Sequence, residues 1–159
     1  MFKNLFKPKP VDFIAPMSGK LLTIEQVPDE VFSSKSVGDG FAIELAGNSV
    51  CSPVDGKVVA VFPTKHAIGI KALDRNEYLI HVGLDTMHFK GEGFTCFVEQ
   101  EQDVKKGQKL LDVDVEFFKS KGVNLISPII VTNCNGRKIR LLKDTEVQQK
   151  EEGILAITI

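Results

Sequence analysis

The most reactive side chains of this sequence are grouped in one stretch, PTKHAIGIKALDRNEYLIHVGLDT, residues 63–86, which holds two of the chain's three histidines. His66 and His81 each stand in a short run of Ile, Leu and Val that is typical of a buried strand. Burial favours the neutral imidazole, which has one ring nitrogen free to attack an electrophile or to bind a metal ion. Three roles are open for the pair: nucleophile, metal ligand or core filler.

The spacing of the two histidines predicts that they meet on one face of a hairpin. If LDRN is the turn, centred between its Asp and its Arg, His66 lies opposite Gly83 and His81 lies opposite Ile68. The rings are then diagonal neighbours, about 7 Å apart at the backbone, and both can act on one small ligand. A slip of one residue would put them on opposite faces. The companions expected on this face are Ile68, Ile70, Leu79 and Gly83.

Other catalytic chemistries find no support in the sequence. It contains no H-x-H or H-E-x-x-H pattern for zinc, no nucleophile elbow for a serine or cysteine triad, and no glycine-rich loop before a helix for a nucleotide. Cys51, Cys96 and Cys134 are far apart, odd in number and without C-x-x-C spacing. This pattern argues against a disulfide framework and favours a reducing cytoplasm.

Length and charge limit the classes of partner. The 159 residues fit one domain, expected over residues 11–159, and 20 basic against 21 acidic residues give a formal charge of −1. No broad cationic surface for nucleic acid follows from this balance, and no apolar run is long enough to cross a bilayer. We expect a soluble, cytoplasmic protein. Residues 1–10, MFKNLFKPKP, are expected to form a flexible tail, because Pro8 and Pro10 stop any helix after about two turns.

The rest of the chain predicts an all-β fold, an antiparallel β-sandwich or barrel with at most short helical turns. Short runs rich in Ile, Val, Leu and Phe alternate with Gly, Pro, Asn and Asp. The expected strands are residues 20–27, 41–46, 57–62, 66–72, 77–84, 124–133 and 154–159. A helical turn is expected within residues 114–122.

Two short motifs recur and indicate duplicated half-motifs within this β-domain. APMSGKLLTI at residues 15–24 and SPVDGKVVAV at residues 52–61 both place Pro before Gly-Lys and an apolar strand, and SPIIVTN at residues 127–133 repeats the opening. VGDGFAIEL at residues 37–45 and VKKGQKLLDV at residues 104–113 form a second pair. Each Pro presets a turn and each Gly tolerates its exit, so the repeats predict equivalent strand-entry corners.

At the level of a family, the sequence resembles the glucose-family enzyme IIA of the bacterial phosphoenolpyruvate-dependent sugar phosphotransferase system. The segments that carry the resemblance are VPDEVF (27–32), VGDGFAI (37–43), SPVDGKV (52–58), PTKHAIGI (63–70) and LIHVGLDTMHFKGEGF (79–94). The segments keep the family's order, and the match as a whole covers nearly the entire chain from about Ile14 to the C-terminus. The resemblance implies an antiparallel β-sandwich and a cytoplasmic phosphotransferase with a phosphohistidine intermediate.

The resemblance also implies a role for each site residue. His81 would be the phosphorylated nucleophile, and the backbone of Gly83 would hold its other ring nitrogen. His66 would stabilise the phosphoryl group, and the Thr64 hydroxyl would orient His66. No metal or cofactor is required for this chemistry.

Partner binding is expected around the two histidines. Asp29 and Asp85 match acidic residues that flank the family's site and suit contact with a partner's cations. Val31, Phe32, Phe62 and Leu79 are expected to form an exposed apolar rim for docking. His88 matches no position of the motif and is expected at the surface.

The partners implied are the histidine-containing phosphocarrier protein as donor and the IIB domain of a sugar permease as acceptor, with contact to the membrane only through the permease. Glucose, N-acetylglucosamine and β-glucoside systems share this domain, so the sugar stays open. The alternative is a regulatory binding module, in which His66 and His81 share a zinc ion with a target protein's carboxylate. Incubation with the phosphoryl donor distinguishes the two.

Overall fold

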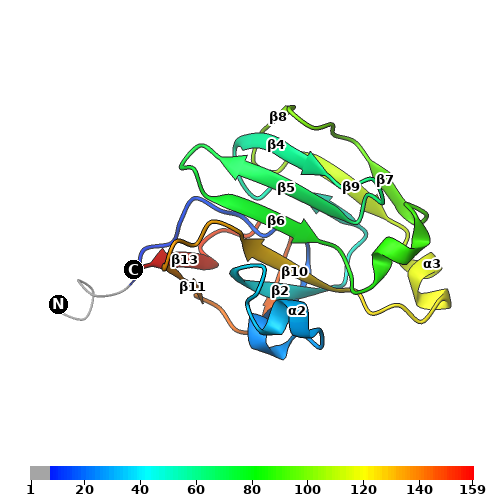
Figure 1. Ribbon diagram of the computed structural model, residues 1–159, viewed down its shortest axis with the longest axis horizontal. Helices are drawn as coiled ribbons and strands as arrows, with labels where there is room; N and C mark the ends of the chain where they lie inside the picture. The colour runs from blue at the N-terminus through cyan, green and yellow to red at the C-terminus, as the bar shows by residue number, and fades with distance from the viewer. Residues whose placement is uncertain (1–7) are drawn as a thin grey trace.

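The structure is a computed structural model that describes residues 8–159 (Figure 1). Of the predicted tail, residues 1–7 lie outside the described residues. Most of the regular secondary structure of the rest is antiparallel β-strand, arranged as a β-sandwich that does not close into a barrel. The predicted all-β sandwich is therefore confirmed.

The main layer is one antiparallel sheet. Among residues 8–159, its strands lie side by side in the order β12-β1-β2-β10-β6-β5-β4-β8. Its strands are β1 (Gly19–Thr23), β2 (Asp39–Leu45), β4 (Gly56–Val61), β5 (Ala67–Ala72), β6 (Glu77–His81), β8 (Asp103–Val104), β10 (Ile126–Val131) and β12 (Glu146–Val147). In Figure 1, β4, β5, β6 and β10 run side by side across the molecule. The central position of β6 places the end of its strand, and with it His81, inside the sheet rather than at an edge.

Two smaller antiparallel sheets complete the sandwich. They have the orders β3-β9-β7 and β11-β13. Their strands are β3 (Ser49–Cys51), β7 (Phe94–Cys96), β9 (Lys109–Val113), β11 (Lys138–Leu141) and β13 (Leu155–Thr158). The short helical turns are η1 (Ile24–Gln26), α2 (Glu30–Ser33), η2 (Thr86–Phe89) and α3 (Val115–Ser120). Of these, α3 falls within the predicted residues 114–122.

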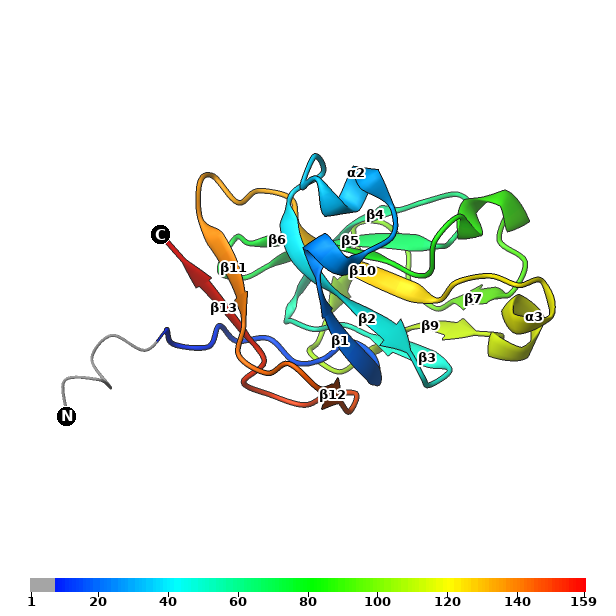
Figure 2. The same ribbon diagram turned by 90° about the horizontal axis from the view of Figure 1, so that it is seen from below.

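The central strands bury apolar side chains on both faces. On one face, Ile129 and Val131 of β10 join the main core between the sheets. On the other face, Ile130 packs in a smaller cluster beneath α2, together with Phe32 and Leu84. Figure 2 shows α2 on one side of β2 and β10. Apolar runs without strict alternation are expected for strands covered on both faces.

The first repeated motif corresponds to two corners that bond to each other. The Ile14 N–H donates to the Pro53 carbonyl at 2.9 Å, and the Cys51 N–H donates to the Pro16 carbonyl at 2.8 Å. The strands that follow, β1 and β4, both begin at the glycine of the motif. The two copies thus pair through their strand-entry corners.

The β5–β6 hairpin has a register one residue away from the predicted one. A 2.9 Å bond joins the Ala72 N–H to the Asn76 carbonyl, so three residues connect the strands instead of a two-residue turn. The last of them, Arg75, adopts a left-handed φ of 74°. This is a known geometry for three-residue hairpin loops, and it places Ala67 opposite His81.

Both predicted histidine pairings in this hairpin are therefore wrong. Ile68 and Ile70 face the main core, whereas His81 and Leu79 face the opposite side, toward α2. Only Leu79 of the expected apolar neighbours thus shares a sheet face with His81. The side-chain alternation along β5 does not fix the direction of His66, because the regular strand begins one residue later, at Ala67.

Candidate functional site

His81 is the last residue of β6, and its ring is buried beneath α2. The side chain is 7 % exposed, and the Phe32 ring packs edge-on against it with 4.9 Å between ring centroids. Phe32 is itself 7 % exposed, so the prediction that it forms part of an exposed rim is wrong. It fixes one side of the His81 ring by packing.

His66 lies beside His81 despite the changed register. The two ring centroids are 4.8 Å apart with an interplanar angle of 79°. The Val82 N–H donates to the His66 carbonyl at 2.7 Å, which ties the residue before β5 to the residue after β6. Phe62 packs edge-on against His66 at 5.5 Å. The structure therefore brings the two histidines together, as the sequence predicts, but by a different pairing.

A hydrogen bond determines which nitrogen of His81 is free. His81 Nδ1 lies 2.8 Å from the Gly83 carbonyl oxygen. Because a carbonyl only accepts, Nδ1 must carry the proton, and Nε2 of the neutral ring keeps its lone pair. Gly83 has a left-handed φ of 76°, and a Cβ there would lie 2.6 Å from Thr86 Cγ2. Glycine is therefore required where the chain turns its carbonyl back toward the ring.

The Thr64 hydroxyl contacts His66 in the complementary way. Thr64 Oγ1 lies 2.5 Å from His66 Nδ1. A hydroxyl can donate to this nitrogen, which leaves the proton of the neutral ring on Nε2. Lys65, between them, has a left-handed φ of 58°, which allows residues 64 and 66 to turn toward each other. The pair of rings then offers one nucleophilic nitrogen and one donor.

The environment keeps both rings neutral. Burial, and next the neighbouring His81, lower the pKa of His66 to about 4. Burial also lowers the pKa of His81 below its ordinary value, but the Gly83 carbonyl and the charges of Asp29 and Asp85 oppose that shift. A ring that stays neutral near pH 7 keeps its lone pair available.

Gly83 is itself held by polar groups that the sequence analysis did not select. Its N–H donates to Ser127 Oγ at 3.1 Å. The next N–H, of Leu84, donates to the Asn124 carbonyl at 2.9 Å, and Thr86 Oγ1 donates to the Val82 carbonyl at 2.6 Å. Thr86 lies in the motif around His81, and Ser127 begins one copy of the repeated Ser-Pro motif. Both residues therefore lie in motifs that the sequence analysis noted, but neither was given a role.

The predicted partner residues surround the rings at different depths. Asp29 caps α2 by accepting from the Val31 N–H at 2.9 Å. Val31 and Phe62 are exposed by 55 % and 39 %, whereas Leu79 is half-buried. Asp29 and the exposed Asp85 line a depression of about 520 Å³ beside the site, together with Pro28, Leu84, His88, Phe89 and residues 122–124.

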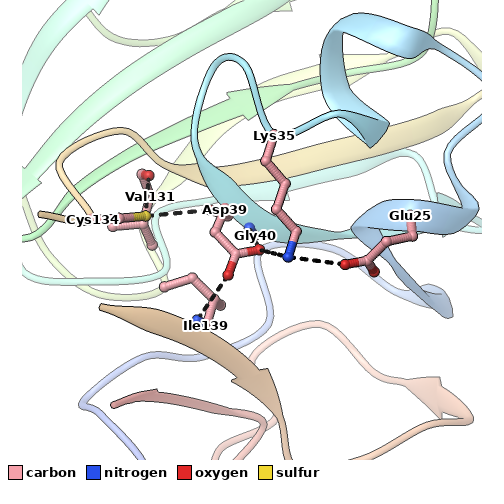
Figure 3. A network of polar contacts seen from close by, with 7 residues as sticks. All are labelled: Glu25, Lys35, Asp39, Gly40, Val131, Cys134 and Ile139. Atoms are coloured by element: carbon pink, nitrogen blue, oxygen red, sulfur yellow. Dashed lines mark hydrogen bonds and ion pairs between the residues drawn. The ribbon is translucent and has the colours of Figure 1, made fainter. Parts of the chain in front are cut away.

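An ionic network fixes the segment that covers the histidines. Lys35, just after α2, pairs with Glu25 of η1 at 3.0 Å and with Asp39 of β2 at 3.7 Å (Figure 3). Asp39 also accepts from the N–H groups of Gly40 and Ile139. Exposed ion pairs are individually weak, but this network ties η1, α2, β2 and β11 together.

Two kinds of feature are absent from residues 8–159. In that part of the chain there is no group of three or more His, Cys, Asp and Glu side chains arranged to hold a metal ion. Over the same residues, none of the helices has the length and apolar character that spanning a membrane would need.

The comparisons with known proteins assign this antiparallel β-sandwich, with its two apposed and buried histidines, to a class of sugar phosphotransferase-system components. Residues 11–136 match the family described as phosphoenolpyruvate-dependent sugar phosphotransferase system, EIIA 1. The chain belongs to this family, and the predicted resemblance is confirmed.

Relatives and a solved structure agree with this assignment. The chain is 45 % identical over 163 residues to a PTS system glucose-specific EIIA component of Oceanobacillus iheyensis, covering 99 % of both chains. It is 45 % identical over 141 residues to a PTS system glucose-specific EIICBA component of Staphylococcus carnosus, covering 89 % of this chain and 21 % of that protein. The glucose permease IIA of Mycoplasma capricolum superposes with a TM-score of 0.84 at 43 % identity, covering 94 % of this chain and 96 % of the other.

Proposed function

We propose that this protein is a phosphohistidine carrier, which accepts a phosphoryl group on His81 Nε2 from the histidine-containing phosphocarrier protein and passes it to the IIB domain of a sugar permease. The observation that supports this most directly is the bond from His81 Nδ1 to the Gly83 carbonyl. It leaves the lone pair on Nε2, and only a nitrogen with a free lone pair can attack phosphorus.

In the proposed reaction, the Nε2 lone pair attacks the phosphorus of the donor phosphohistidine. The new N–P bond forms on His81 while the donor's N–P bond breaks, and the donor nitrogen recovers its electron pair. The proton on His81 Nδ1 stays on the ring, so no external base is needed. Onward transfer reverses the roles, with the acceptor group of the IIB domain as the nucleophile.

His66 serves as the donor that stabilises the moving phosphoryl group. With Nδ1 accepting from Thr64, its Nε2–H can donate to a phosphoryl oxygen as charge develops. Neither step calls for a metal or another cofactor. Zinc bound by His66 and His81 is the alternative function, and it needs further ligands from a target protein because two nitrogens leave a tetrahedral ion half coordinated.

The proposed partners bind where the apolar rim and the carboxylates meet. Val31 and Phe62 offer exposed apolar surface, and Asp29 and Asp85 offer negative charge beside the rings. We assign glucose as the sugar served because several relatives are named glucose-specific EIIA components. The protein acts in the cytoplasm and meets the membrane only through the permease.

The test is incubation with phosphoenolpyruvate, enzyme I and the phosphocarrier protein, followed by mass spectrometry. We expect one phosphoryl group per chain, located on the His81 peptide, lost in mild acid and stable in alkali. His81→Gln should abolish labelling. His66→Gln should still be labelled but should transfer onward about a hundredfold more slowly, the typical cost of losing one preorganised donor.

The matched control is His88→Gln, because His88 is exposed and, within residues 8–159, has neither a hydrogen bond to nor ring packing against His66 or His81. It should be labelled to the same stoichiometry as the wild type, on the His81 peptide. An acid-stable label, a label on His66, or no label on the wild type would each reject the proposed carrier, and the last result together with tight zinc binding would favour the alternative.

A further inference from the structure

The chain directly after β6 consists of two successive peptide groups that are each held at both ends. In the first, between Val82 and Gly83, the carbonyl accepts from Thr86 Oγ1 at 2.6 Å. Its N–H donates to Ser127 Oγ at 3.1 Å. Two side-chain hydroxyls thus fix the plane of this peptide group.

The second peptide group lies between Gly83 and Leu84 and faces the histidine. Its carbonyl accepts from His81 Nδ1 at 2.8 Å, and its N–H donates to the Asn124 carbonyl at 2.9 Å. Gly83 is the hinge between the two groups, and its φ of 76° belongs to a residue with wide conformational freedom. The direction of the carbonyl that reaches His81 therefore depends on how the preceding group is held.

The two hydroxyls are buried and fully engaged. Thr86 and Ser127 are both 0 % exposed. Besides accepting from Gly83, Ser127 donates to the Leu125 carbonyl at 2.9 Å. Burying a hydroxyl costs free energy unless it is hydrogen-bonded. Here the Thr86 hydroxyl donates to the Val82 carbonyl and the Ser127 hydroxyl accepts from the Gly83 N–H, so both hold the peptide group that precedes Gly83. Within residues 8–159, neither hydroxyl has a hydrogen bond to the His81 ring, so any effect of the two hydroxyls on the ring passes through the backbone.

We propose that Thr86 and Ser127 are positioning residues that fix the tautomer of His81 through the Gly83 carbonyl. The inference rests on the proposed function of His81 as nucleophile. The neutral ring keeps its proton on Nδ1 because an oriented acceptor stands opposite it. When the acceptor turns away, the proton redistributes to Nε2, and the nucleophilic lone pair is lost in that fraction of molecules.

The repeated Ser-Pro motif offers a matched control. Ser52 is 0 % exposed and donates to the Val54 carbonyl at 2.7 Å, much as Ser127 donates to Leu125. Within residues 8–159, the Ser52 hydroxyl has no hydrogen bond to residues 82–84, the segment after β6. Ser52→Ala therefore removes a comparable buried hydroxyl and leaves the histidine site unchanged.

The experiment compares Thr86→Val, Thr86→Ser, Ser127→Ala and Ser52→Ala with the wild type. The main readout is the ¹⁵N shifts of the His81 ring nitrogens at a pH where the ring is neutral, which report the tautomer without any phosphoryl donor. The second readout is the rate of phosphoryl acceptance, and thermal unfolding records stability. Thr86→Val keeps the side-chain shape without the hydroxyl, and Thr86→Ser restores the hydroxyl without the methyl group.

We expect the wild-type His81 to show a protonated Nδ1 and an unprotonated Nε2. In Thr86→Val and Ser127→Ala, the two nitrogen shifts should move toward each other. Acceptance should fall on the order of tenfold, the lower end of the loss known for removing the hydrogen-bond partner of a metal-ligating histidine. Thr86→Ser should recover both readouts. Ser52→Ala should lower the melting temperature but leave both readouts as in the wild type.

Two results would overturn the inference. One is an unchanged tautomer in both Thr86→Val and Ser127→Ala, and the other is a tautomer shift of equal size in Ser52→Ala. A wild type with the expected tautomer that accepts no phosphoryl group rejects the proposed function instead, and the variants' ring shifts still decide the positioning role.

Discussion

Replacing Gly83 by alanine tests the link between the backbone and the nucleophile most directly. The added Cβ would lie 2.6 Å from Thr86 Cγ2 and 3.2 Å from the Asn124 carbonyl oxygen. The left-handed φ of 76° costs a residue with a Cβ roughly 1–2 kcal/mol. Overpacking in a closed site typically adds about 1–3 kcal/mol. We therefore expect Gly83→Ala to lower the free energy of unfolding by about 2–5 kcal/mol.

The matched control for this change is Gly136→Ala. Gly136 has a φ of 80°, close to that of Gly83, but a Cβ there would meet nothing within 4 Å. Only the conformational cost of about 1–2 kcal/mol applies, partly offset because alanine restricts the unfolded chain. The difference between the two variants therefore measures the crowding at Gly83.

The assay is urea unfolding of both variants, combined with the rate of phosphoryl acceptance. To relieve the contact with Thr86, Gly83→Ala must either shift the backbone or rotate the Thr86 side chain away from its bond to the Val82 carbonyl. Both changes disturb the peptide groups that direct the Gly83 carbonyl toward His81 Nδ1. Acceptance should then fall on the order of tenfold, while Gly136→Ala should accept at the wild-type rate. Equal unfolding midpoints for the two variants, or a normal acceptance rate in Gly83→Ala, would refute the account of how Gly83 supports the site.

Three further predictions concern the docking surface, the pH dependence and the donor ring. Val31→Asp should slow transfer from the phosphocarrier protein with little change in melting temperature, because Val31 is exposed. Phe32→Asp should unfold the domain or lower its free energy of unfolding by several kcal/mol, because Phe32 is buried. Similar melting temperatures for the two variants would contradict this. The pKa of His66 falls from 6.5 to about 4 on folding, so the unfolded chain binds more protons between these pH values. The free energy of unfolding should therefore decrease by at most ~3.4 kcal/mol as the pH falls from 6.5 toward 4. His66→Gln should flatten that part of the stability curve. Thr64→Val removes the partner of His66 Nδ1 and should slow onward transfer more than acceptance, measured by single turnover in each direction.

The sequence predicted the contact between the two histidines but not the strand pairing that produces it. The two histidines are in contact, but not through the expected pairing, because the loop has three residues and Arg75 adopts a left-handed conformation. An Asp-Arg pair does not specify a turn type strongly, and a change of one residue reverses the face of every side chain in the strand. Contact was preserved because His66 lies outside the regular part of β5, which periodicity cannot foresee.

Burial on both faces explains the remaining differences. Phe32 was expected in the exposed docking rim, but α2 has only four residues, too few for a periodic signal to show that the Phe32 ring packs with Ile130 and Leu84. Short strands such as β3, β7 and β12 have two or three residues, too few for any periodic signal. Among the strands of five or more residues, β1, β2, β4, β5, β6 and β10 overlap predicted runs, since their apolar residues are bounded by turn residues, whereas β9 was not among the predicted strands.

The charges around His81 act in opposite directions before and after phosphorylation in the proposed cycle. Asp29 and Asp85 raise the pKa of the free ring, against the larger effect of burial. A phosphoryl group on Nε2 brings additional negative charge, which the same carboxylates repel. Asp29 is restrained from turning away because its carboxylate accepts from the Val31 N–H and begins α2. The helix cap therefore holds a negative charge beside the phosphorylated ring and favours release of the phosphoryl group, while the fixed Nδ1 proton returns the ring to its nucleophilic form.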